Sequence, residues 1–276
     1  MKSNIFKTFS LKGKTVILTG GFGFLGLQYT TTLGQAGANL VIWDLKDDDI
    51  LQKIVRRIRK ETKIKILAQS VDITDETAVQ RAVNEVLKKF KTIDVLINNA
   101  ALNPGIGEES KKFFSPYEKY PIDLWKKEFD VNVHGAMICI KAVAPHMMKN
   151  KKGAILNVSS GVSVGAYDNR TYTDVGWSDR YKSIAYTTSK TAIVGLTRQW
   201  AEYLGKYGIR VNAFSPGGVQ PKKIDLNFVK SYAHGTMLNR MAQIGEYGPV
   251  ILFLCSDASS YMTGANVIVD GGKSAW

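Results

Sequence analysis

The chain has 276 residues, of which 45% are hydrophobic and 22% are charged, and its formal net charge at pH 7 is +13. This composition is globular, and the length suits one large α/β domain over residues 1–276. No apolar run is long enough to span a membrane, and residues 1–10 lack the apolar stretch of a signal peptide. We therefore expect a cytoplasmic protein without a membrane segment.

The positive charge is spread over several segments rather than gathered in one. Basic residues fall in 53–65, 88–91 and 149–152, without the interleaved aromatic residues of a single-strand nucleic-acid platform. We expect a solvated basic surface and no nucleic-acid partner; attraction of a phosphorylated substrate or cofactor is the alternative. Cys139 and Cys255 lie in apolar helical patterns, which predicts buried, reduced thiols, and no Cys or His spacing indicates a metal site.

Short apolar segments rich in Val and Ile alternate with amphipathic segments along the chain. Strands are expected at 15–19, 40–43, 64–70, 95–98, 154–158, 210–214 and 267–269, and helices near 24–36, 47–61, 75–90, 122–149, 183–206 and 246–256. Strands that are apolar throughout are buried on both faces, as in parallel sheets covered by helices. The pattern predicts a doubly wound α/β fold, a seven-stranded parallel sheet flanked by helices that binds its ligand at the carboxyl ends of the strands.

The first expected strand is followed by Gly20, Gly23 and Gly26, three residues apart, at the start of a helix. Glycines in this position allow a tight turn, close approach of the backbone to a phosphate, and close packing of the helix on the strand. The helix N-terminus adds free N–H groups and a favourable dipole for a pyrophosphate. The succession of strand, glycine turn and helix favours the dinucleotide site of a Rossmann fold over a purely structural turn.

Polar residues follow the next three strands. Asp44 ends the second, where a carboxylate accepts hydrogen bonds from the adenosine ribose and repels a 2′-phosphate; this favours NAD, and Lys46 keeps NADP as the less favoured cofactor. The alternative role for Asp44 is a helix N-cap. Asp72 follows the third strand and can reach the adenine or cap the next helix. Asn98 and Asn99 end the fourth, where their amides can stiffen the sheet edge or form an ordinary turn.

Tyr186 and Lys190 lie four residues apart at the start of a long amphipathic segment, so they share one face of a helix. A free phenol has a pKa of about 10 and is a poor base at neutral pH. A neighbouring ammonium and the positive ring of an oxidised nicotinamide favour the phenolate, which gives the pair acid–base activity. Together with the glycine turn, the pair predicts a nicotinamide-dependent oxidoreductase.

With these motifs in order, the chain resembles the classical short-chain dehydrogenase/reductase family over nearly its whole length. The shared motifs are the glycine turn, Asp72, 98–100, Asn132, 159–160, Tyr186 with Lys190, 210–212, 215–218, 261–264 and 269–272. The resemblance implies a catalytic tetrad: Asn132 holds a water and kinks its helix, Ser160 hydrogen-bonds the substrate oxygen, Tyr186 is the general acid/base, and Lys190 binds the nicotinamide ribose. It implies cofactor contacts at Gly20, Gly23, Phe24, Leu25, Gly26, Asp44, Asp72, Ile73, Asn99, Ala100, Tyr186, Lys190, Pro216, Gly217 and Val219.

The glycine turn departs from the classical pattern, whose middle glycine falls at the position of Phe24 rather than Gly23. The spacing resembles that of the extended branch, which includes sugar-nucleotide epimerases and dehydratases and usually carries a larger C-terminal substrate domain. The motif at 269–272, close after the last expected strand, favours the classical branch. Ala101 replaces the glycine that usually follows 98–100, which is a mild change.

Ser160 and Tyr186 are 26 positions apart, about twice the interval usual in the family. The extra segment, about 167–180, is expected to form a loop beside the active site. Its aromatic faces suit a hydroxyl-rich substrate, and hydroxyls or phosphate can be bound by Asp168, Asn169, Arg170 and Asp174. A surface loop without a substrate role is the alternative. If the insertion displaces Ser160, Ser159 or Ser163 takes its role.

The resemblance also implies a mobile substrate lid over about 217–244, and a homotetramer or homodimer formed through 122–149 and 183–206. Residues 228–232 and 239–242, the insertion and Trp276 resemble dehydrogenases of bacterial surface-sugar pathways, including flagellin modification and nonulosonic acid biosynthesis. The expected reaction is hydride transfer between NAD(H) and a secondary alcohol or ketone of a sugar or sugar phosphate. The alternatives are a polyol, gluconate-type or 3-oxoacyl reductase, an epimerase or dehydratase that retains NAD, and a redox sensor without turnover.

Overall fold

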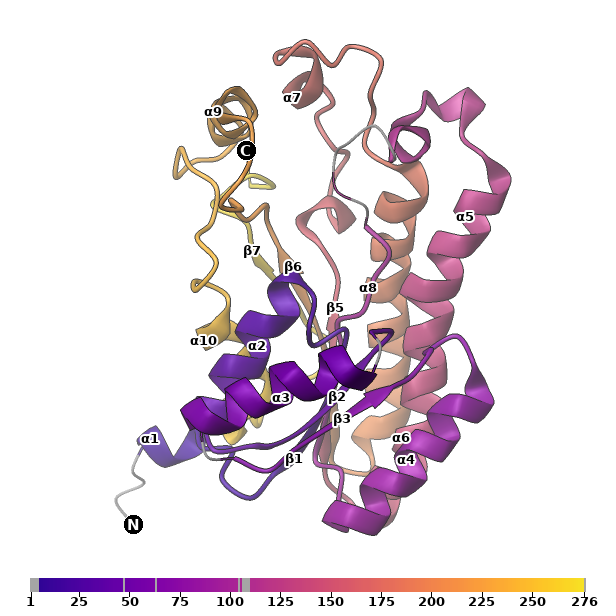
Figure 1. Cartoon of the computed structure of the whole chain (residues 1–276), viewed down its shortest axis with the longest axis vertical. Coiled ribbons are helices and arrows are strands. Elements are labelled where there is room, and N and C mark those ends of the chain that lie inside the picture. The colour runs from indigo at the N-terminus through magenta and orange to yellow at the C-terminus, as the bar shows by residue number, and fades with distance from the viewer. Residues whose placement is uncertain (1–4, 47, 63, 104, 106–109, 276) are drawn as a thin grey trace.

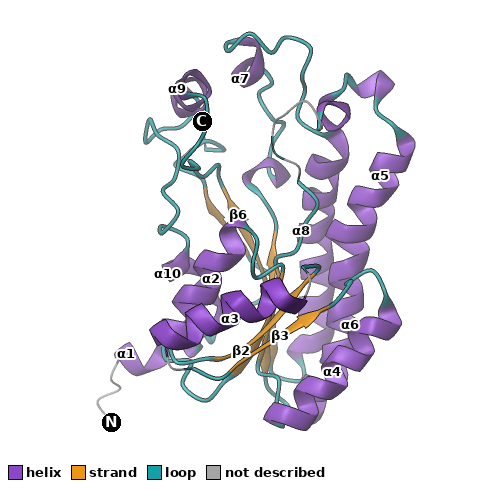
Figure 2. Ribbon diagram, in the orientation of Figure 1, coloured by secondary structure: helices purple, strands orange, loops and turns teal. Residues whose placement is uncertain are grey.

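One parallel sheet forms the centre of the molecule, with helices on both of its faces (Figures 1 and 2). The computed structural model describes residues 5–46, 48–62, 64–103, 105 and 110–275. Seven strands pair in the order β3-β2-β1-β4-β5-β6-β7, and all of the pairs are parallel. The expected doubly wound α/β fold with a seven-stranded sheet is confirmed.

The strands begin and end within two residues of the expected positions. They are β1 (Thr15–Thr19), β2 (Asn39–Asp44), β3 (Ile66–Ser70), β4 (Val95–Asn98), β5 (Gly153–Val158), β6 (Ile209–Pro216) and β7 (Asn266–Val269). The central strands β1, β4 and β5 are almost entirely buried, whereas the edge strand β7 is mostly half-buried. Their continuous apolar character therefore reflects burial on both faces of the sheet.

The long helix expected over 122–149 is divided by a π-helical turn. Three short α-helices, α1, α7 and α9, form in segments for which the sequence predicted none, and α7 lies in the insertion that was expected to be a loop. The helices are α1 (Ile5–Thr8), α2 (Phe24–Gln35), α3 (Asp48–Thr62), α4 (Glu76–Phe90), α5 (Ile122–Phe129), the π turn η3 (Asp130–His134), α6 (Gly135–Asn150), α7 (Arg170–Thr173), α8 (Ile184–Gly205), α9 (Leu226–His234) and α10 (Gly248–Cys255).

Two hydrophobic cores fill the space between the sheet and its helices. Neighbouring residues of β1 point to opposite faces, so Leu18 packs in the core beneath α2, α3 and α10, and Ile17 packs in the core beneath α4, α6 and α8. Leu33 of α2 and Val143 of α6 are fully buried in these two cores. Burying one such side chain contributes about 1.5–3 kcal/mol, so both helical layers are held firmly on the sheet.

The strand order reverses between β1 and β4, and hydrogen bonds join the carboxyl ends of these two strands. The hydroxyl of Thr19 accepts bonds of 3.0 Å from the N–H groups of Asn99 and Ala100. The Asn99 amide donates to the carbonyl oxygens of Thr19 and Gly20 at 3.0 and 3.1 Å. This edge is where doubly wound folds bind ligands, and the asparagine stiffens it.

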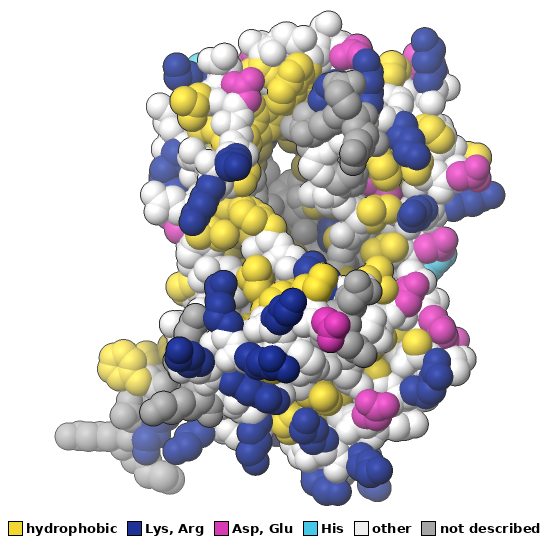
Figure 3. All heavy atoms as spheres, in the orientation of Figure 1, with side chains coloured by type: hydrophobic (Ala, Val, Ile, Leu, Met, Phe, Trp, Pro, Cys, Tyr) yellow, Lys and Arg dark blue, Asp and Glu magenta, His cyan; other side chains and the backbone are white. Residues whose placement is uncertain are grey.

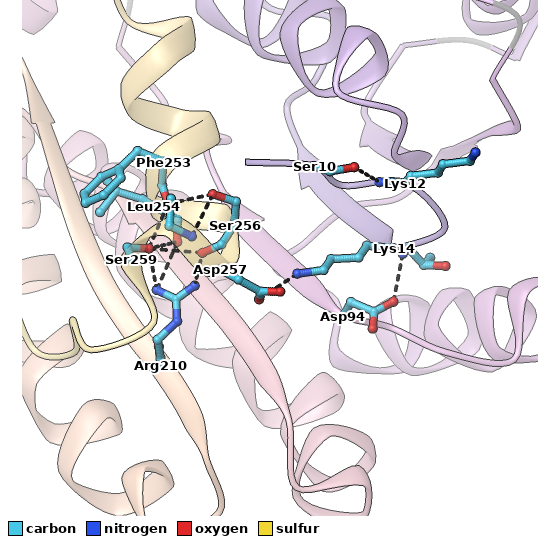
Figure 4. Close-up of polar contacts among 12 residues, drawn as sticks. Ser10, Lys12, Lys14, Asp94, Arg210, Phe253, Leu254, Ser256, Asp257 and Ser259 are labelled. Atoms are coloured by element: carbon cyan, nitrogen blue, oxygen red, sulfur yellow. Dashed lines mark hydrogen bonds and ion pairs between the residues drawn. The ribbon is translucent and has the colours of Figure 1, made fainter. Parts of the chain in front are cut away.

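The amino edge of the sheet is tied to α10 by Arg210, near the start of β6 (Figure 4). Its guanidinium donates to the carbonyl oxygens of Leu254 and Ser256 at 3.2 and 2.9 Å, and to the hydroxyl of Ser259 at 2.8 Å. The carbonyl groups at the end of a helix lack partners within the helix, so a cation is favourable there. Arg210 therefore closes α10 and fixes it to β6.

Both cysteines are free and buried, Cys139 in α6 and Cys255 at the end of α10, as the sequence predicted. Burial raises the pKa of each thiol to about 12, so neither is a thiolate at neutral pH. In the part of the chain that the structure describes, no helix combines the length and hydropathy needed to cross a membrane. Over the same residues, His, Cys, Asp and Glu side chains form no group that could hold a metal ion.

Replacing Arg210 tests its structural role. We expect Arg210→Met to lower the free energy of unfolding by about 2–3 kcal/mol, because the carbonyl groups at the end of α10 lose a charged donor. Arg81, exposed on α4, offers a matched control, and Arg81→Met should change stability by less than about 0.5 kcal/mol. Urea denaturation of both variants measures the difference, and equal stabilities would contradict the role given to Arg210.

Candidate functional site

The turn between β1 and α2 depends on its glycines. Gly20 has a φ of +61°, and a Cβ there would stand 2.8 Å from the Cα of Ala100. A Cβ on Gly26 would overlap the carbonyl oxygen of Gly20, so α2 can lie this close to the turn only without that side chain. Gly23 is the N-cap of α2 and offers its first N–H groups no side-chain partner. These groups are therefore available to an anion such as a pyrophosphate.

A cavity of about 390 Å³ opens at the carboxyl ends of the strands, and it joins the glycine turn to Tyr186 and Lys190. Figure 3 shows this face hollowed below α7 and α9, with basic side chains gathered over α3. Most of the predicted cofactor residues line the cavity: Gly20, Gly23, Phe24, Leu25, Gly26, Asp44, Ile73, Asn99, Ala100, Tyr186, Lys190 and Pro216. The cavity is also lined by residues that the sequence did not single out as cofactor contacts: Trp43, Leu45, Lys46, Val71, Ala101, Asn103, Val131, Val158 and Ser159.

Phe24 stands where the classical pattern has its middle glycine. It is the first residue of α2, and its side chain is 48% exposed, at the cavity rather than inside the turn. The turn closes through Gly23, whose N–H donates to the carbonyl oxygen of Gly20 at 3.1 Å. A bulky residue at position 24 is therefore compatible with the same turn.

Asp44 lies at the end of β2 with its carboxylate at the cavity. Its Oδ2 accepts a hydrogen bond of 3.0 Å from the N–H of Phe22, and its Oδ1 lies 3.8 Å from the ammonium of Lys46. The helix that follows begins only at Asp48, so Asp44 is not its N-cap. The carboxylate instead ties the glycine turn to β2.

Some predicted cofactor residues do not line the cavity: Asp72, Gly217 and Val219. The exposed Asp72 closes a turn, because its Oδ1 accepts bonds from the N–H and the hydroxyl of Thr74 at 2.9 and 2.7 Å. The cap of α4 is Asp75, not Asp72. The neighbouring Ile73 is the residue that faces the cavity.

Gly217 and Val219 shape the backbone that leaves β6. The N–H of Gly217 donates to the carbonyl oxygen of Val269 at 2.9 Å, and a Cβ on this glycine would stand 2.7 Å from the Cα of Asp270. Val219 pairs with Ala242 in an isolated parallel bridge. The two ends of the predicted lid, 217–244, are therefore joined to each other.

Tyr186 lies in the first turn of α8, is 8% exposed, and lines the cavity. Burial raises the pKa of its phenol to about 12; the nearby hydroxyl of Ser160 acts in the opposite direction, whereas Glu128 and Tyr232 raise the pKa further. Lys190, one turn along the helix, places its ammonium 5.7 Å from the centroid of the Tyr186 ring. The structure thus brings the phenol, the hydroxyl and the ammonium together.

The ammonium of Lys190 is anchored on the sheet. It is buried and donates a bond of 2.8 Å to the carbonyl oxygen of Val158, the last residue of β5. Burial lowers the pKa of Lys190 to about 8, because the charged form loses its hydration. The lysine therefore carries its charge at neutral pH and loses it in the alkaline range.

Ser160 is the serine that the structure places beside Tyr186. The hydroxyl of Ser159 is buried and donates to the carbonyl oxygen of Lys190 at 2.7 Å. The hydroxyl of Ser163 lies 3.2 Å from that of Ser215. The long interval before Tyr186 therefore leaves Ser160 next to the phenol.

Asn132 lies in the π turn η3 and is 2% exposed. Its Oδ1 accepts a bond of 2.7 Å from the N–H of Leu102, and its amide donates to the hydroxyl of Ser189 at 3.0 Å. Ser189 in turn donates to the carbonyl oxygen of Tyr186 at 2.8 Å. The interruption of the helix matches the expected kink, and it connects Asn132 to the helix that carries Tyr186.

The insertion at 167–180 packs on α9 through aromatic side chains. Tyr172 is 2% exposed, and its ring centroid lies 6.4 Å from that of Trp177 and 6.0 Å from that of Phe228 on α9. Ser231 of α9 donates a hydrogen bond of 2.9 Å to Asp174. α7 and α9 lie next to each other beyond the carboxyl edge of the sheet (Figure 1). The insertion and the lid helix form one packed unit.

Polar groups of the insertion bond to the protein itself. Arg170 binds Asp168 through two hydrogen bonds of 2.8 and 2.9 Å. The side-chain oxygen of Asn169 accepts a bond of 2.9 Å from the N–H of Lys182. Asp174 accepts the bond from α9. These contacts shape the insertion, and contact of these groups with substrate stays a prediction.

Sequence reasoning missed two charged residues near Tyr186, Glu128 and Lys182. Glu128 of α5 is 0% exposed, and the ammonium of Lys182 lies 4.5 Å from the centroid of the Tyr186 ring. Helical spacing gave no signal for either residue. Lys182 precedes the N-cap of α8, and Glu128 is separated from Asn132 by the start of the π turn, so neither shares a regular helix face with the predicted site residue.

Known proteins are similar to this chain over nearly its whole length. A family model described as enoyl-(acyl carrier protein) reductase matches residues 25–274. The chain is 32% identical to the short chain dehydrogenase/reductase astE of Aspergillus oryzae, over 96% of this chain and 97% of the relative. It is 31% identical to the 3-oxoacyl-acyl-carrier-protein reductase FabG of Thermotoga maritima, over 95% and 98% of the two chains.

A solved structure is also similar to this chain. A gluconate 5-dehydrogenase from Burkholderia cenocepacia J2315, in complex with NADP and tartrate, is similar with a TM-score of 0.85 and 26% identity, over 98% of this chain and 99% of that one. The fold and the matched length agree. The chain therefore belongs to the short-chain dehydrogenase/reductase family, the NAD(P)-dependent oxidoreductases that act on alcohols and ketones.

Proposed function

We propose that the enzyme transfers hydride between NAD(H) and a secondary alcohol or ketone of a sugar or sugar phosphate, with Asn132, Ser160, Tyr186 and Lys190 as its catalytic tetrad. One observation carries the proposal. The phenol of Tyr186 lies beside Ser160 and the Lys190 ammonium, in a cavity that extends to the glycine turn. The acid–base group and the dinucleotide cradle thus share one cavity.

The residues of the chain divide the proton chemistry between them. Ser160 would bind the substrate oxygen and hold it against the phenol of Tyr186. Because the pKa of Tyr186 is raised to about 12, the phenol holds its proton at neutral pH and can give it to a carbonyl oxygen during reduction. During oxidation the phenol must first lose its proton, which the ammonium of Lys190 favours. The bound nicotinamide supplies or accepts the hydride.

NAD fits the end of the cavity that holds Asp44. The Asp44 side chain is 11% exposed and fixed to the glycine turn, whereas that of Lys46 is 39% exposed and lies 3.8 Å away. The poorly hydrated carboxylate of Asp44 would therefore repel a 2′-phosphate more strongly than the hydrated ammonium of Lys46 would attract it. The structure of the gluconate 5-dehydrogenase contains NADP, which describes the cofactor of that protein and not of this chain.

A hydroxyl-rich ring suits the wall formed by the insertion and α9. Aromatic side chains dominate their contact, including Tyr167, Tyr172 and Trp177 of the insertion and Phe228 and Tyr232 of α9. Tyr172, Phe228 and Tyr232 are buried in this contact, so the half-buried Tyr167 and Trp177 are the rings with surface left on which a sugar can stack. This supports a sugar or sugar phosphate, as surface-glycan biosynthesis would supply, ahead of a polyol, gluconate or 3-oxoacyl substrate.

Gly26→Ala tests the cofactor cradle. The added methyl group would overlap the carbonyl oxygen of Gly20 and push α2 away from the turn, so we expect NADH affinity to fall at least about tenfold. Gly195→Ala is the control, since a Cβ there meets open space in the middle of α8. That variant should bind NADH like the wild type. Titration calorimetry compares them, and equal affinities would contradict the assigned cradle.

Asp44→Asn tests the preference for NAD. The amide oxygen can still accept the bond from the N–H of Phe22, so the turn stays intact while the charge is removed. We expect the affinity for NADPH relative to NADH to rise about tenfold. Fluorescence titration with both cofactors measures the ratio. A wild-type preference for NADPH, or an unchanged ratio in the variant, would overturn the role given to Asp44.

Tyr186→Phe tests the reaction itself. A screen of sugars, sugar phosphates, nucleotide sugars, polyols and 3-oxoacyl thioesters against NAD(H) and NADP(H) identifies the substrate for the assay. We expect turnover to fall at least about a thousandfold and NADH affinity to change only a few-fold, because the phenol acts on the proton. Unchanged turnover would reject Tyr186 as the acid/base. Product formation without net NADH change would identify an epimerase or dehydratase instead.

A further inference from the structure

A second ammonium lies closer to the Tyr186 ring than that of Lys190. Lys182 stands just before the N-cap of α8, and its Nζ is 4.5 Å from the ring centroid, compared with 5.7 Å for Lys190. The family tetrad includes no such residue. The phenol thus faces two cations, one inside the helix and one at its entrance.

Lys182 is held in place at both its backbone and its side chain. Its Nζ donates a bond of 3.0 Å to the side-chain oxygen of Asn103, which lines the cavity. Its N–H donates to Asn169 of the insertion at 2.9 Å, and the preceding N–H, of Tyr181, donates to the carbonyl oxygen of Phe114 at 2.8 Å. Through the bond to Asn169, the insertion fixes the backbone segment that leads into α8.

A buried carboxylate lies within the same network. Glu128 is 0% exposed, and its Oε2 accepts bonds from the hydroxyls of Tyr120 at 2.7 Å and Ser183 at 2.6 Å. Its Oε1 is buried and has no hydrogen-bond partner in the described part of the chain. Ser183 also accepts the N–H of Tyr186 at 3.0 Å and so caps α8. Burial raises the pKa of the Glu128 carboxyl, whereas the bonds from Ser183 and Tyr120 and the charge of Lys182 act to lower it. A buried carboxylate needs a compensating cation, and Lys182 supplies the positive charge that acts on it.

We propose that Lys182 is a positioning residue that stabilises the ionised form of Tyr186 as a second ammonium, and that Glu128 is its buried counter-charge. The inference rests on the proposed acid–base role of Tyr186. Lys182 is half-buried, and the loss of hydration lowers its pKa to about 8 even with the charge of Glu128 acting to raise it, so the ammonium is mostly protonated at neutral pH. The insertion thereby connects to the chemistry through the backbone of Lys182.

Other charged or titratable groups also act on this phenol, from several elements packed around it. A substitution of Lys182 should leave these groups where they are, because each of them changes the pKa of Tyr186 or has its own pKa changed by the Tyr186 charge. They are Lys190 on α8, Glu128 on α5, Tyr232 on α9 and Tyr29 on α2. A neutral side chain of similar length at position 182 leaves them in place.

Lys182→Met provides the test. In the presence of saturating NAD⁺, the ionisation of Tyr186 is followed by phenolate absorbance, as the difference between each variant and the same variant carrying Tyr186→Phe. In this complex the positive nicotinamide ring favours the phenolate and brings the ionisation of Tyr186 toward the pH range in which Lys182 still carries its charge. We therefore expect Lys182→Met to raise the pKa of Tyr186 by about one unit, and Lys182→Arg to restore most of the wild-type value, because a neighbouring cation favours the phenolate. The pH profile of kcat/KM should shift with it.

Lys206→Met is the matched control. Lys206 lies beyond the other end of α8 and also places its ammonium over tyrosine rings, 5.4 Å from those of Tyr203 and Tyr207. This variant should leave both the titration and the pH profile unchanged. An unshifted titration in Lys182→Met, with or without a fall in activity, would give Lys182 a packing role only and overturn the inference.

Glu128→Gln completes the experiment. The amide oxygen can still accept the bonds from Tyr120 and Ser183, so the variant removes mainly the charge. Losing that charge lowers the pKa of Tyr186 directly, but it also weakens the hold of Lys182 on its proton. We therefore expect Glu128→Gln to lower the pKa of Tyr186 more when Lys182 is already Met than when it is present. Equal shifts of the Tyr186 pKa in the two backgrounds would reject Glu128 as the counter-charge of Lys182. The phenolate titration does not depend on turnover. It therefore tests the role of Lys182 independently of whether the proposed reaction is correct.

Discussion

The site depends on one hydrogen bond, from the buried ammonium of Lys190 to the carbonyl oxygen of Val158. Val158 is the last residue of β5, so this bond fixes α8 at the carboxyl edge of the sheet. Because Tyr186 is one helical turn away, the same bond sets the phenol at the cavity. A buried cation is costly, which is why the carbonyl partner decides where the lysine can lie.

The cofactor end of the cavity is fixed by a different set of contacts. Thr19 and Asn99 join β1 to β4 beneath the glycine turn, and Asp44 joins β2 to the same turn. Backbone groups, rather than long side chains, therefore define the cradle. Such a cradle is rigid before the ligand arrives, so little conformational entropy is lost on binding. Phe24 can replace a glycine at the cavity rim because its side chain lies outside the turn, which closes through Gly23.

Much of the fold and of the site could be predicted from the sequence, because both rest on local patterns. Continuous apolar runs located all seven strands, and the spacing of Tyr186 and Lys190 gave their shared helix face. The π turn around Asn132 was expected as a kink only by resemblance. The oligomeric state and the cytoplasmic location stay predictions, and Trp276, which contributed to the surface-sugar resemblance, lies outside the described residues.

The remaining features depend on contacts between distant parts of the chain. Glu128 and Lys182 each look like an ordinary surface charge in the sequence, and only the packing of α5 beside α8 brings them into one network. The polar residues of the insertion were recognised, but their partners were not. Asp168 binds Arg170, and Asn169 binds the backbone of Lys182. Sequence shows which hydrogen bonds a residue can make, whereas the fold selects among them.

The most direct measurement of the central claim is a crystal structure of the enzyme with NAD⁺ bound. We expect the pyrophosphate at the N-terminus of α2, the adenosine ribose at Asp44, and the nicotinamide ribose within hydrogen-bond distance of Lys190, with the Tyr186 hydroxyl facing the nicotinamide ring. A nicotinamide bound elsewhere, or a Tyr186 hydroxyl turned away from it, would rule out Tyr186 and Lys190 as the catalytic pair.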